Sequence, residues 1–174
     1  MISTKILRYI FPLILLITIL LVSPCCTAIT YRVVDGDTIE IQSGEYVRYL
    51  GIDTPEKGEP LFNDATDLNR SLLTEGVIGF ESDVTDKDIY NRLLRYVYAG
   101  DVFVNLELVR NGLALAYAED RFEDNKYYSI FTEACDMAYE DGLGIWSLDH
   151  IHPKLEEKQD DYYIPPEYLD MLNN

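Results

Sequence analysis

Residues 31–55 read YRVVDGDTIEIQSGEYVRYLGIDTP. Two turn sequences, Asp35-Gly36-Asp37 and Ser43-Gly44, divide this stretch into runs that are rich in β-branched and aromatic residues. Such runs, separated by short turns, are typical of neighbouring β-strands. The stretch therefore predicts a three-stranded meander, with strands over 29–34, 38–41 and 45–52.

The chain after this meander contains two segments with helix start and stop signals. Asn63 or Asp64 can cap a helix that ends before Gly76. Asn105 can cap a shorter helix that ends at Gly112. Both segments carry apolar residues at helical spacing, so each is expected to pack one face against the sheet.

A third helix is predicted over 129–141, and two more strands over 77–84 and 92–99. The helix is expected to bury the apolar residues that recur at helical spacing: Ile130, Ala134, Met137 and Ala138. Five strands and three helices in this order are typical of a small closed sheet with helices on its outside. We therefore expect an α+β, mainly β fold, in which about three helices pack outside a five-stranded antiparallel OB-type barrel.

This predicted domain covers residues 29–146, and Trp146 is expected to close it. Residues 147–174 contain three prolines and many charged residues. That composition predicts an acidic C-terminal tail on the surface of the protein.

Residues 1–28 have the pattern of a targeting segment. Lys5 and Arg8 precede an apolar run over 10–22, and small residues follow as far as Ala28. A basic start, a short apolar run and a small-residue exit predict a secretory signal peptide, and thus a secreted protein. An uncleaved membrane anchor on the cell surface is the alternative, and lipidation of a cysteine in this segment is a third.

The composition limits the function classes. The chain has 174 residues, with 14 basic and 31 acidic side chains and a formal net charge of −17. A hydrophobic content of 48% is too high for a disordered chain. Proteins that bind nucleic acid through bulk charge are usually basic, so the acidic composition argues against a general binder of that kind. An enzyme needs positive charge only where a phosphate is bound, so nucleic-acid chemistry stays open.

Two carboxylates, one at a turn and one at a strand end, point to a metal site. Asp37 lies at a turn and Asp53 at the end of the third strand, and the two converge if their strands are neighbours. Converging carboxylates can hold a hard divalent cation such as Ca²⁺, which prefers oxygen ligands. The backbone carbonyl of Thr54 would add a third oxygen. Glu56, held by Pro55, could then accept a proton from a water molecule.

Two arginines complete the chemistry. Arg48 and Arg92 can bind a phosphate from two sides and oppose the charge that builds when phosphorus is attacked. Each motif alone has an ordinary structural explanation, as a hairpin turn, a strand exit or a surface salt bridge. Strand alternation also places the side chains of Arg48 and Asp53 on opposite faces of the strand, unless Gly51 marks a bulge or Asp53 lies beyond the ladder. The ordered combination predicts metal-assisted phosphodiester cleavage.

Four segments of the chain resemble the staphylococcal nuclease (thermonuclease) family. They occur in the family order: Val34–Thr38, Arg48–Glu56, Tyr90–Arg92 and Gly142–Trp146. The resemblance runs from about Tyr31 to Trp146. It implies an OB-type barrel and Ca²⁺-dependent hydrolysis of phosphodiester bonds in DNA and RNA.

The resemblance also implies roles for single residues. Asp37 and Asp53 resemble the calcium carboxylates of the family, and Thr54 its carbonyl ligand. Glu56 resembles the residue proposed as general base, and Arg48 and Arg92 resemble the phosphate-binding arginines. Tyr90 resembles a tyrosine that contacts a substrate phosphate, and Tyr117 one that lines the nucleotide pocket.

The chain departs from the best-known family member in its positive charge. That member has a lysine where this chain has Ile89, and Lys87 lies nearby. The segment 57–63 is shorter than the basic loop of that member and carries Glu59. Because phosphate contacts supply most nucleic-acid affinity, we expect weaker substrate binding and a higher KM. The acidity is alternatively an adaptation to a salty environment.

Two function classes follow. The first is an exported monomeric nuclease, which requires the whole set of predicted catalytic and metal residues: Asp37, Arg48, Asp53, Glu56 and Arg92. The second is a non-catalytic module that binds nucleic acid or protein, because the same barrel also serves as a binding scaffold. The presence of the whole set favours the nuclease.

Overall fold

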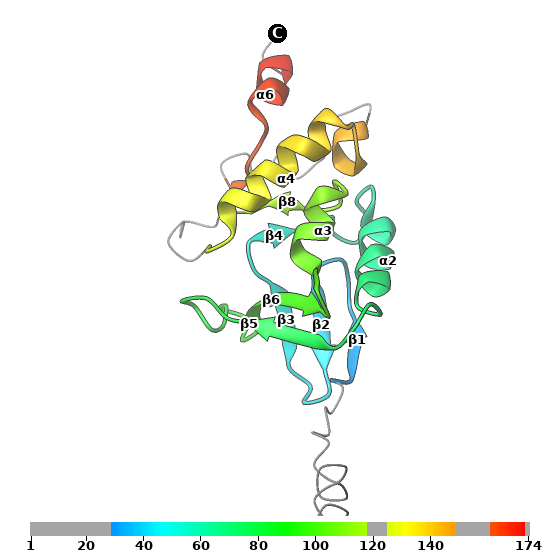
Figure 1. The fold of residues 1–174 in the computed structure, drawn as a ribbon, viewed down its shortest axis with the longest axis vertical. Helices are drawn as coiled ribbons and strands as arrows, with labels where there is room; N and C mark the ends of the chain where they lie inside the picture. The colour runs from blue at the N-terminus through cyan, green and yellow to red at the C-terminus, as the bar shows by residue number, and fades with distance from the viewer. Residues whose placement is uncertain (1–28, 118–124, 149–160, 173–174) are drawn as a thin grey trace, which may run out of the picture.

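The computed structural model describes residues 29–117, 125–148 and 161–172 (Figure 1). The strands are β1 Tyr31–Val33, β2 Thr38–Ile41, β3 Tyr46–Tyr49, β4 Ile52–Asp53, β5 Ile78–Glu81, β6 Leu93–Ala99, β7 Val102–Phe103 and β8 Leu115–Ala116. The helices are α2 Phe62–Leu72, α3 Val104–Arg110, α4 Tyr128–Glu140, the 3-10 helix η2 Gly144–Ser147 and α6 Pro166–Leu172. Within these three ranges, no helix is both long and apolar enough to cross a membrane. The targeting segment predicted over 1–28 lies outside the described residues.

The main sheet is curled and has the strand order β1-β2-β3-β6-β5, with β7 paired to β6. Its first three strands form the predicted antiparallel meander, in which Thr38 pairs with Arg48. The OB-type, mainly β fold with helices on its outside is thereby confirmed. The prediction of a purely antiparallel sheet is wrong, because β3 and β6 run parallel and Arg48 pairs with Leu94. A parallel pair needs a long crossover, and the chain through α2 and β5 provides it.

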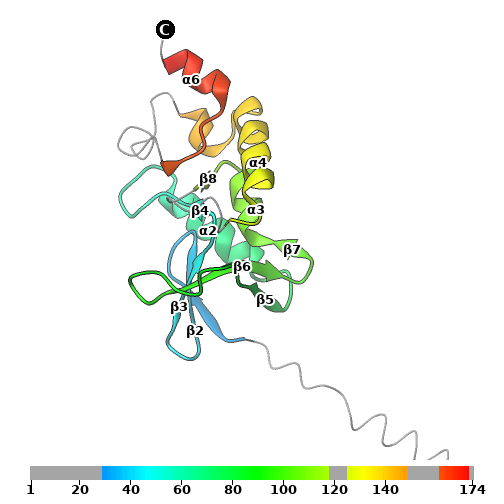
Figure 2. The same ribbon diagram turned by 90° about the vertical axis from the view of Figure 1, so that its left-hand side faces the viewer.

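Gly51 divides the strand predicted over 45–52. Its φ of +76° is a conformation that residues with a Cβ rarely adopt. A Cβ at this position would also lie 2.8 Å from Cε2 of Phe131. The chain therefore leaves the main sheet after β3, and β4 pairs with β8 instead (Figures 1 and 2). Asp53 consequently lies beyond the ladder of β3.

The core lies between the sheet and the helices α3 and α4. Leu108 of α3 is fully buried, as are Val47 of β3 and Val97 of β6. The buried face of α4 consists of Phe131, Ala134, Cys135 and Ala138. The prediction that Met137 belongs to this face is wrong, because its side chain is 53% exposed. Cys135 is fully buried, and this burial raises the pKa of its thiol to about 12.

Both predicted helix caps are wrong. The helix α2 begins at Phe62, and Leu61 precedes it in the left-handed conformation with a φ of +66° and no side-chain cap. Asn63 and Asp64 lie inside the helix. Asn105 also lies inside its helix, α3, where its fully buried amide has a different role. It accepts a hydrogen bond from the backbone N–H of Val97 and donates one to the carbonyl of Leu50, both at 2.9 Å.

Asn105→Ala is expected to lower the free energy of unfolding by about 2–4 kcal/mol. The substitution deprives two buried backbone groups of their hydrogen bonds and disconnects α3 from the chain between β3 and β4. Urea unfolding followed by circular dichroism measures the change. Asn111→Ala is the matched control, because the exposed amide of Asn111 bonds only locally, to the carbonyl of Glu107. Equal losses in the two variants would contradict this role of Asn105.

The C-terminal segment does not behave as a surface tail where the structure describes it. Within 161–172, three apolar or aromatic residues are buried: Tyr162, Ile164 and Tyr168. The ring of Tyr168 packs edge-on against Tyr139 of α4 and Trp146 of η2. The expectation of a surface tail fails here because the average composition of 147–174 conceals a few well-spaced apolar side chains.

Candidate active site

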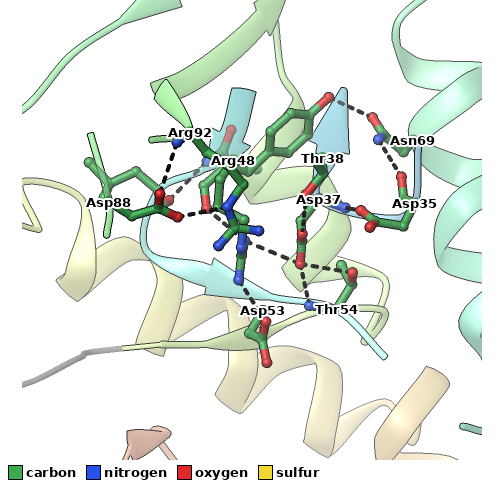
Figure 3. A network of polar contacts seen from close by, with 12 residues as sticks. Asp35, Asp37, Thr38, Arg48, Asp53, Thr54, Asn69, Asp88 and Arg92 are labelled. Carbon is green, nitrogen blue, oxygen red and sulfur yellow. Dashed lines mark hydrogen bonds and ion pairs between the residues drawn. The ribbon is translucent and has the colours of Figure 1, made fainter. Parts of the chain in front are cut away.

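Arg48 lies between two carboxylates, Asp37 on the turn before β2 and Asp53 on β4 (Figure 3). Its Nη1 lies 3.2 Å from Oδ2 of Asp37, and its Nη2 donates to Oδ1 of Asp53 at 2.6 Å. The side chain of Arg48 is only 11% exposed, and those of Asp37 and Asp53 are 7% and 11% exposed. The predicted convergence of the two carboxylates is confirmed, whereas their role as metal ligands stays a prediction.

The charge of Arg48 depends on its acidic neighbours. Burial lowers the pKa of the guanidinium, but Asp37 and Asp53 outweigh this effect and hold the pKa above its ordinary value. Asp35 and Glu56 act in the same direction, so the Glu56 carboxylate also lies within electrostatic reach of Arg48. The site therefore combines one buried positive charge with several surrounding carboxylates.

Thr54 fixes the orientation of Asp37. Its backbone N–H and its hydroxyl both donate to Oδ2 of Asp37, at 2.7 and 2.8 Å. The turn before β2 approaches Thr54 closely at Gly36, where a Cβ would lie 2.6 Å from Oγ1 of Thr54. Only glycine allows this approach. Thr54 thus lies at the predicted site, while the predicted ligand role of its carbonyl stays a prediction.

A buried hydrogen-bond chain connects the same turn to α2. The hydroxyl of Tyr49 donates to the amide oxygen of Asn69 at 2.8 Å, and the amide nitrogen donates to the carbonyl of Asp35 at 2.9 Å (Figure 3). Asn69 is fully buried. Burial, and then the charge of Asp37, raise the pKa of Asp35 to about 6. Sequence patterns miss Asn69, which looks like an ordinary polar helix residue.

Arg92 lies directly before β6, the strand that pairs with β3 and its Arg48. Asp88 holds it in place: Oδ2 accepts from Nε of Arg92 at 2.6 Å, and Oδ1 accepts from its backbone N–H at 2.9 Å. The same Oδ1 accepts from the backbone N–H of Tyr90. The ring of Tyr90 is largely exposed and lies 5.6 Å from Cζ of Arg92. Asp88 is a site residue that the sequence patterns miss, although an acidic residue four positions before an arginine is a usable signal.

Glu56 lies on the surface, after the buried Pro55. Its backbone N–H donates to Oε2 of Glu59 at 2.5 Å, and the backbone N–H of Glu59 donates to the carbonyl of Glu56 at 2.9 Å. This local turn fixes the backbone at Glu56. Because Glu56 is exposed, water can reach the side chain that is predicted to act as base.

Tyr117 follows β8, and its backbone N–H donates to the carbonyl of Gly51 at 3.0 Å. It also forms an isolated antiparallel bridge with Tyr162 from the C-terminal segment. The hydroxyl of Tyr162 donates to Oδ2 of Asp53 at 2.7 Å. Tyr162 is the third residue near the site that the sequence patterns miss, after Asn69 and Asp88, because it is 109 positions away from Asp53.

Comparison with known proteins identifies the family. The family model described as staphylococcal nuclease homologue matches residues 46–148. The chain belongs to this family. It is 36% identical to a thermonuclease of Staphylococcus intermedius over 124 residues. This aligned region covers 66% of this chain and 73% of that protein.

Two further relatives of the chain occur in Bacillus subtilis (strain 168). The SPbeta prophage-derived endonuclease YokF is 39% identical over 128 residues, or 67% of this chain and 42% of that protein. Endonuclease YncB is 40% identical over 128 residues, or 67% of this chain and 59% of that protein. The chain thus matches only about half of the length of these two relatives.

The donor set of this staphylococcal nuclease homologue fits a hard cation. Asp37 and Asp53 direct carboxylate oxygens at one positive group, Arg48, and both are buried. Within the described residues there is no cluster of three or more His, Cys, Asp or Glu side chains that could hold a metal ion. Calcium takes about six to eight oxygen ligands and accepts carbonyls and water among them. The two carboxylates are therefore chemically suitable ligands, to which the predicted carbonyl of Thr54 would add a third oxygen.

Proposed function

We propose that the protein is an exported Ca²⁺-dependent nuclease that hydrolyses phosphodiester bonds of DNA, RNA or both. One observation carries the proposal: the buried Arg48 lies between two carboxylates, one on the turn before β2 and one on β4, and a second arginine precedes β6, which pairs with β3. The family membership of the chain and the names of its relatives, thermonuclease and endonuclease, support the same activity.

The proposed mechanism assigns each side chain a task. Asp37, Asp53 and the carbonyl of Thr54 would hold Ca²⁺, and the bound ion would supply positive charge that stabilises the attacked phosphate. Glu56 accepts the proton of the attacking water. Arg48 and Arg92 bind phosphate oxygens through their planar donor pairs and oppose the developing negative charge.

The substrate-binding tasks fall to two tyrosines. Tyr90 contacts a phosphate, which its exposed position beside Arg92 supports. Tyr117 lines the nucleotide pocket, which its place two residues after Leu115, the partner of Asp53, supports. We propose that the protein acts as a monomer.

Export is the second part of the proposal. The basic, apolar and small-residue sequence of residues 1–28 supports it. The mass of the mature protein, recovered from the medium and from the membrane fraction of the producing cells, tests it. A mass that lacks about 28 residues, found in the medium, indicates a cleaved and secreted protein. The full mass in the membrane fraction indicates an anchored one.

Cleavage of single-stranded DNA is expected to be detectable at low salt and to fade as the salt concentration rises. The chain carries a net charge of −17 and repels DNA overall, so binding depends on local contacts between cationic side chains and phosphates, and salt weakens these contacts. A gel that resolves DNA length, run over a salt series with Ca²⁺ present, measures this. A folded protein that binds the DNA but does not cleave it at any salt concentration would instead support the non-catalytic binding module.

A further inference from the structure

The C-terminal segment, residues 161–172, contacts the carboxylate of Asp53 through the hydroxyl group of Tyr162. Oη of Tyr162 donates to Oδ2 of Asp53 at 2.7 Å, while Oδ1 of the same carboxylate accepts from Arg48. Tyr162 is buried, with 9% of its surface exposed. Both oxygens of Asp53 thus accept a hydrogen bond, one from Arg48 on β3 and one from Tyr162, which follows the family-matched region that ends at residue 148.

Several independent contacts hold this segment in place. Tyr162 forms a backbone bridge with Tyr117, and their rings lie 5.3 Å apart. The backbone N–H of Tyr163 donates to the carbonyl of Ala116 at 3.0 Å, and its hydroxyl donates to both carboxylate oxygens of Asp136. The segment therefore lies as a short extended stretch beside β8. From this position the hydroxyl of Tyr162 reaches Asp53 on β4.

We propose that Tyr162 is a positioning residue that orients Asp53 for the cation, so that the C-terminal segment completes the active site. This inference rests on the proposed function, in which Asp53 is a metal ligand. Hydrogen bonds to a ligating carboxylate fix its orientation, and their loss weakens metal binding by about 10–100-fold. A carboxylate has about four acceptor positions, so it can accept from Tyr162 and bind a cation together.

Figures 1 and 2 show how the topology permits this contact. The β4–β8 pair lies between the main sheet and the C-terminal segment in both views. Asp53 of β4 pairs with Leu115 of β8. Tyr162 pairs with Tyr117, the residue directly after β8. The carboxylate is thus reached by Arg48 from the main sheet and by Tyr162 from the added segment.

Tyr162→Phe in the full chain is expected to weaken Ca²⁺ binding about tenfold or more, as measured by isothermal titration with CaCl₂ alone. The substitution removes the hydroxyl and keeps the ring that packs on Tyr117. A purely structural role of Tyr162 would therefore leave the affinity unchanged. Thermal unfolding in the absence of calcium checks that the variant folds like the parent protein.

Tyr163→Phe is the matched control. It removes a neighbouring hydroxyl that donates to Asp136 of α4, away from Asp53, and is expected to bind calcium like the parent protein. An affinity of Tyr162→Phe equal to that of the parent would overturn the inference. Tighter binding would overturn it too, because the hydroxyl would then compete with the cation.

The Asp53→Asn variant separates this inference from the proposed function. If the parent binds calcium, Asp53→Asn does not, and Tyr162→Phe equals the parent, the metal site stands and only the role of Tyr162 is refuted. If Asp53→Asn binds as tightly as the parent, the proposed metal site is itself wrong, and the inference about Tyr162 is refuted together with it.

Discussion

Glu56→Gln lowers kcat by about 10²–10⁴-fold and leaves the calcium affinity nearly unchanged, if Glu56 acts as a general base. The amide keeps the shape of the side chain but accepts no proton at neutral pH. Glu56 lies on the surface next to the site, whereas the carboxylates in contact with Arg48 are the buried Asp37 and Asp53. Removal of the base therefore affects the chemical step and spares the ligands.

Two measurements separate the effect of Glu56 on kcat from its effect on calcium affinity. Steady-state cleavage of single-stranded DNA gives kcat and KM, and isothermal titration gives the calcium affinity. Glu140→Gln is the control, since Glu140 is exposed at the end of α4 and should lose no activity. Equal losses of kcat and of calcium affinity in Glu56→Gln would mean that Glu56 is a direct ligand or a structural residue.

Arg92→Ala is expected to lower the rate of cleavage by about 10²–10³-fold. The arginine precedes the strand that pairs with β3, and Asp88 holds its Nε and backbone N–H. A guanidinium fixed in this way is preorganised to stabilise charge that develops on the phosphate. Arg92→Lys should recover only part of the rate, because lysine keeps the charge and loses the planar pair of donors.

The rate of DNA cleavage at saturating substrate and calcium tests Arg92. Arg110→Ala is the matched control, because Arg110 also pairs with a nearby acidic residue, Glu107, but on the exposed end of α3. It should cleave at the parental rate. An unchanged rate in Arg92→Ala would remove this residue from the mechanism.

The sequence predicts the parts of this protein whose signals are local. Turn residues and alternating apolar runs predict the meander of β1, β2 and β3. The sequence allows Arg48 and Asp53 to meet if Gly51 marks a bulge or if Asp53 lies beyond the ladder. The second alternative is the one observed, because the chain leaves the main sheet at Gly51 and Asp53 pairs with Leu115 of β8. Hydrophobic periodicity places α4 within one residue at each end, although it assigns Met137 to the wrong face.

The remaining features depend on contacts between distant parts of the chain. Nothing local distinguishes Asn105 as a bridge between β6 and Leu50 rather than a helix cap. The parallel pairing of β3 with β6 arises from a crossover that strand patterns do not encode. Tyr162 meets Asp53 across most of the chain, and the charged composition around it conceals a buried side chain.

The most direct test of the central claim is cleavage of single-stranded DNA at low salt by the purified protein, with Ca²⁺ or with EDTA. We predict shortened DNA with calcium, none with EDTA, and recovery of cleavage when calcium is added in excess of the chelator. The Asp37→Asn and Asp53→Asn variants should fail to cleave at the calcium concentration that saturates the parent. Cleavage that is equally fast in EDTA, or intact DNA under every condition from a folded protein, would contradict the proposed calcium-dependent nuclease.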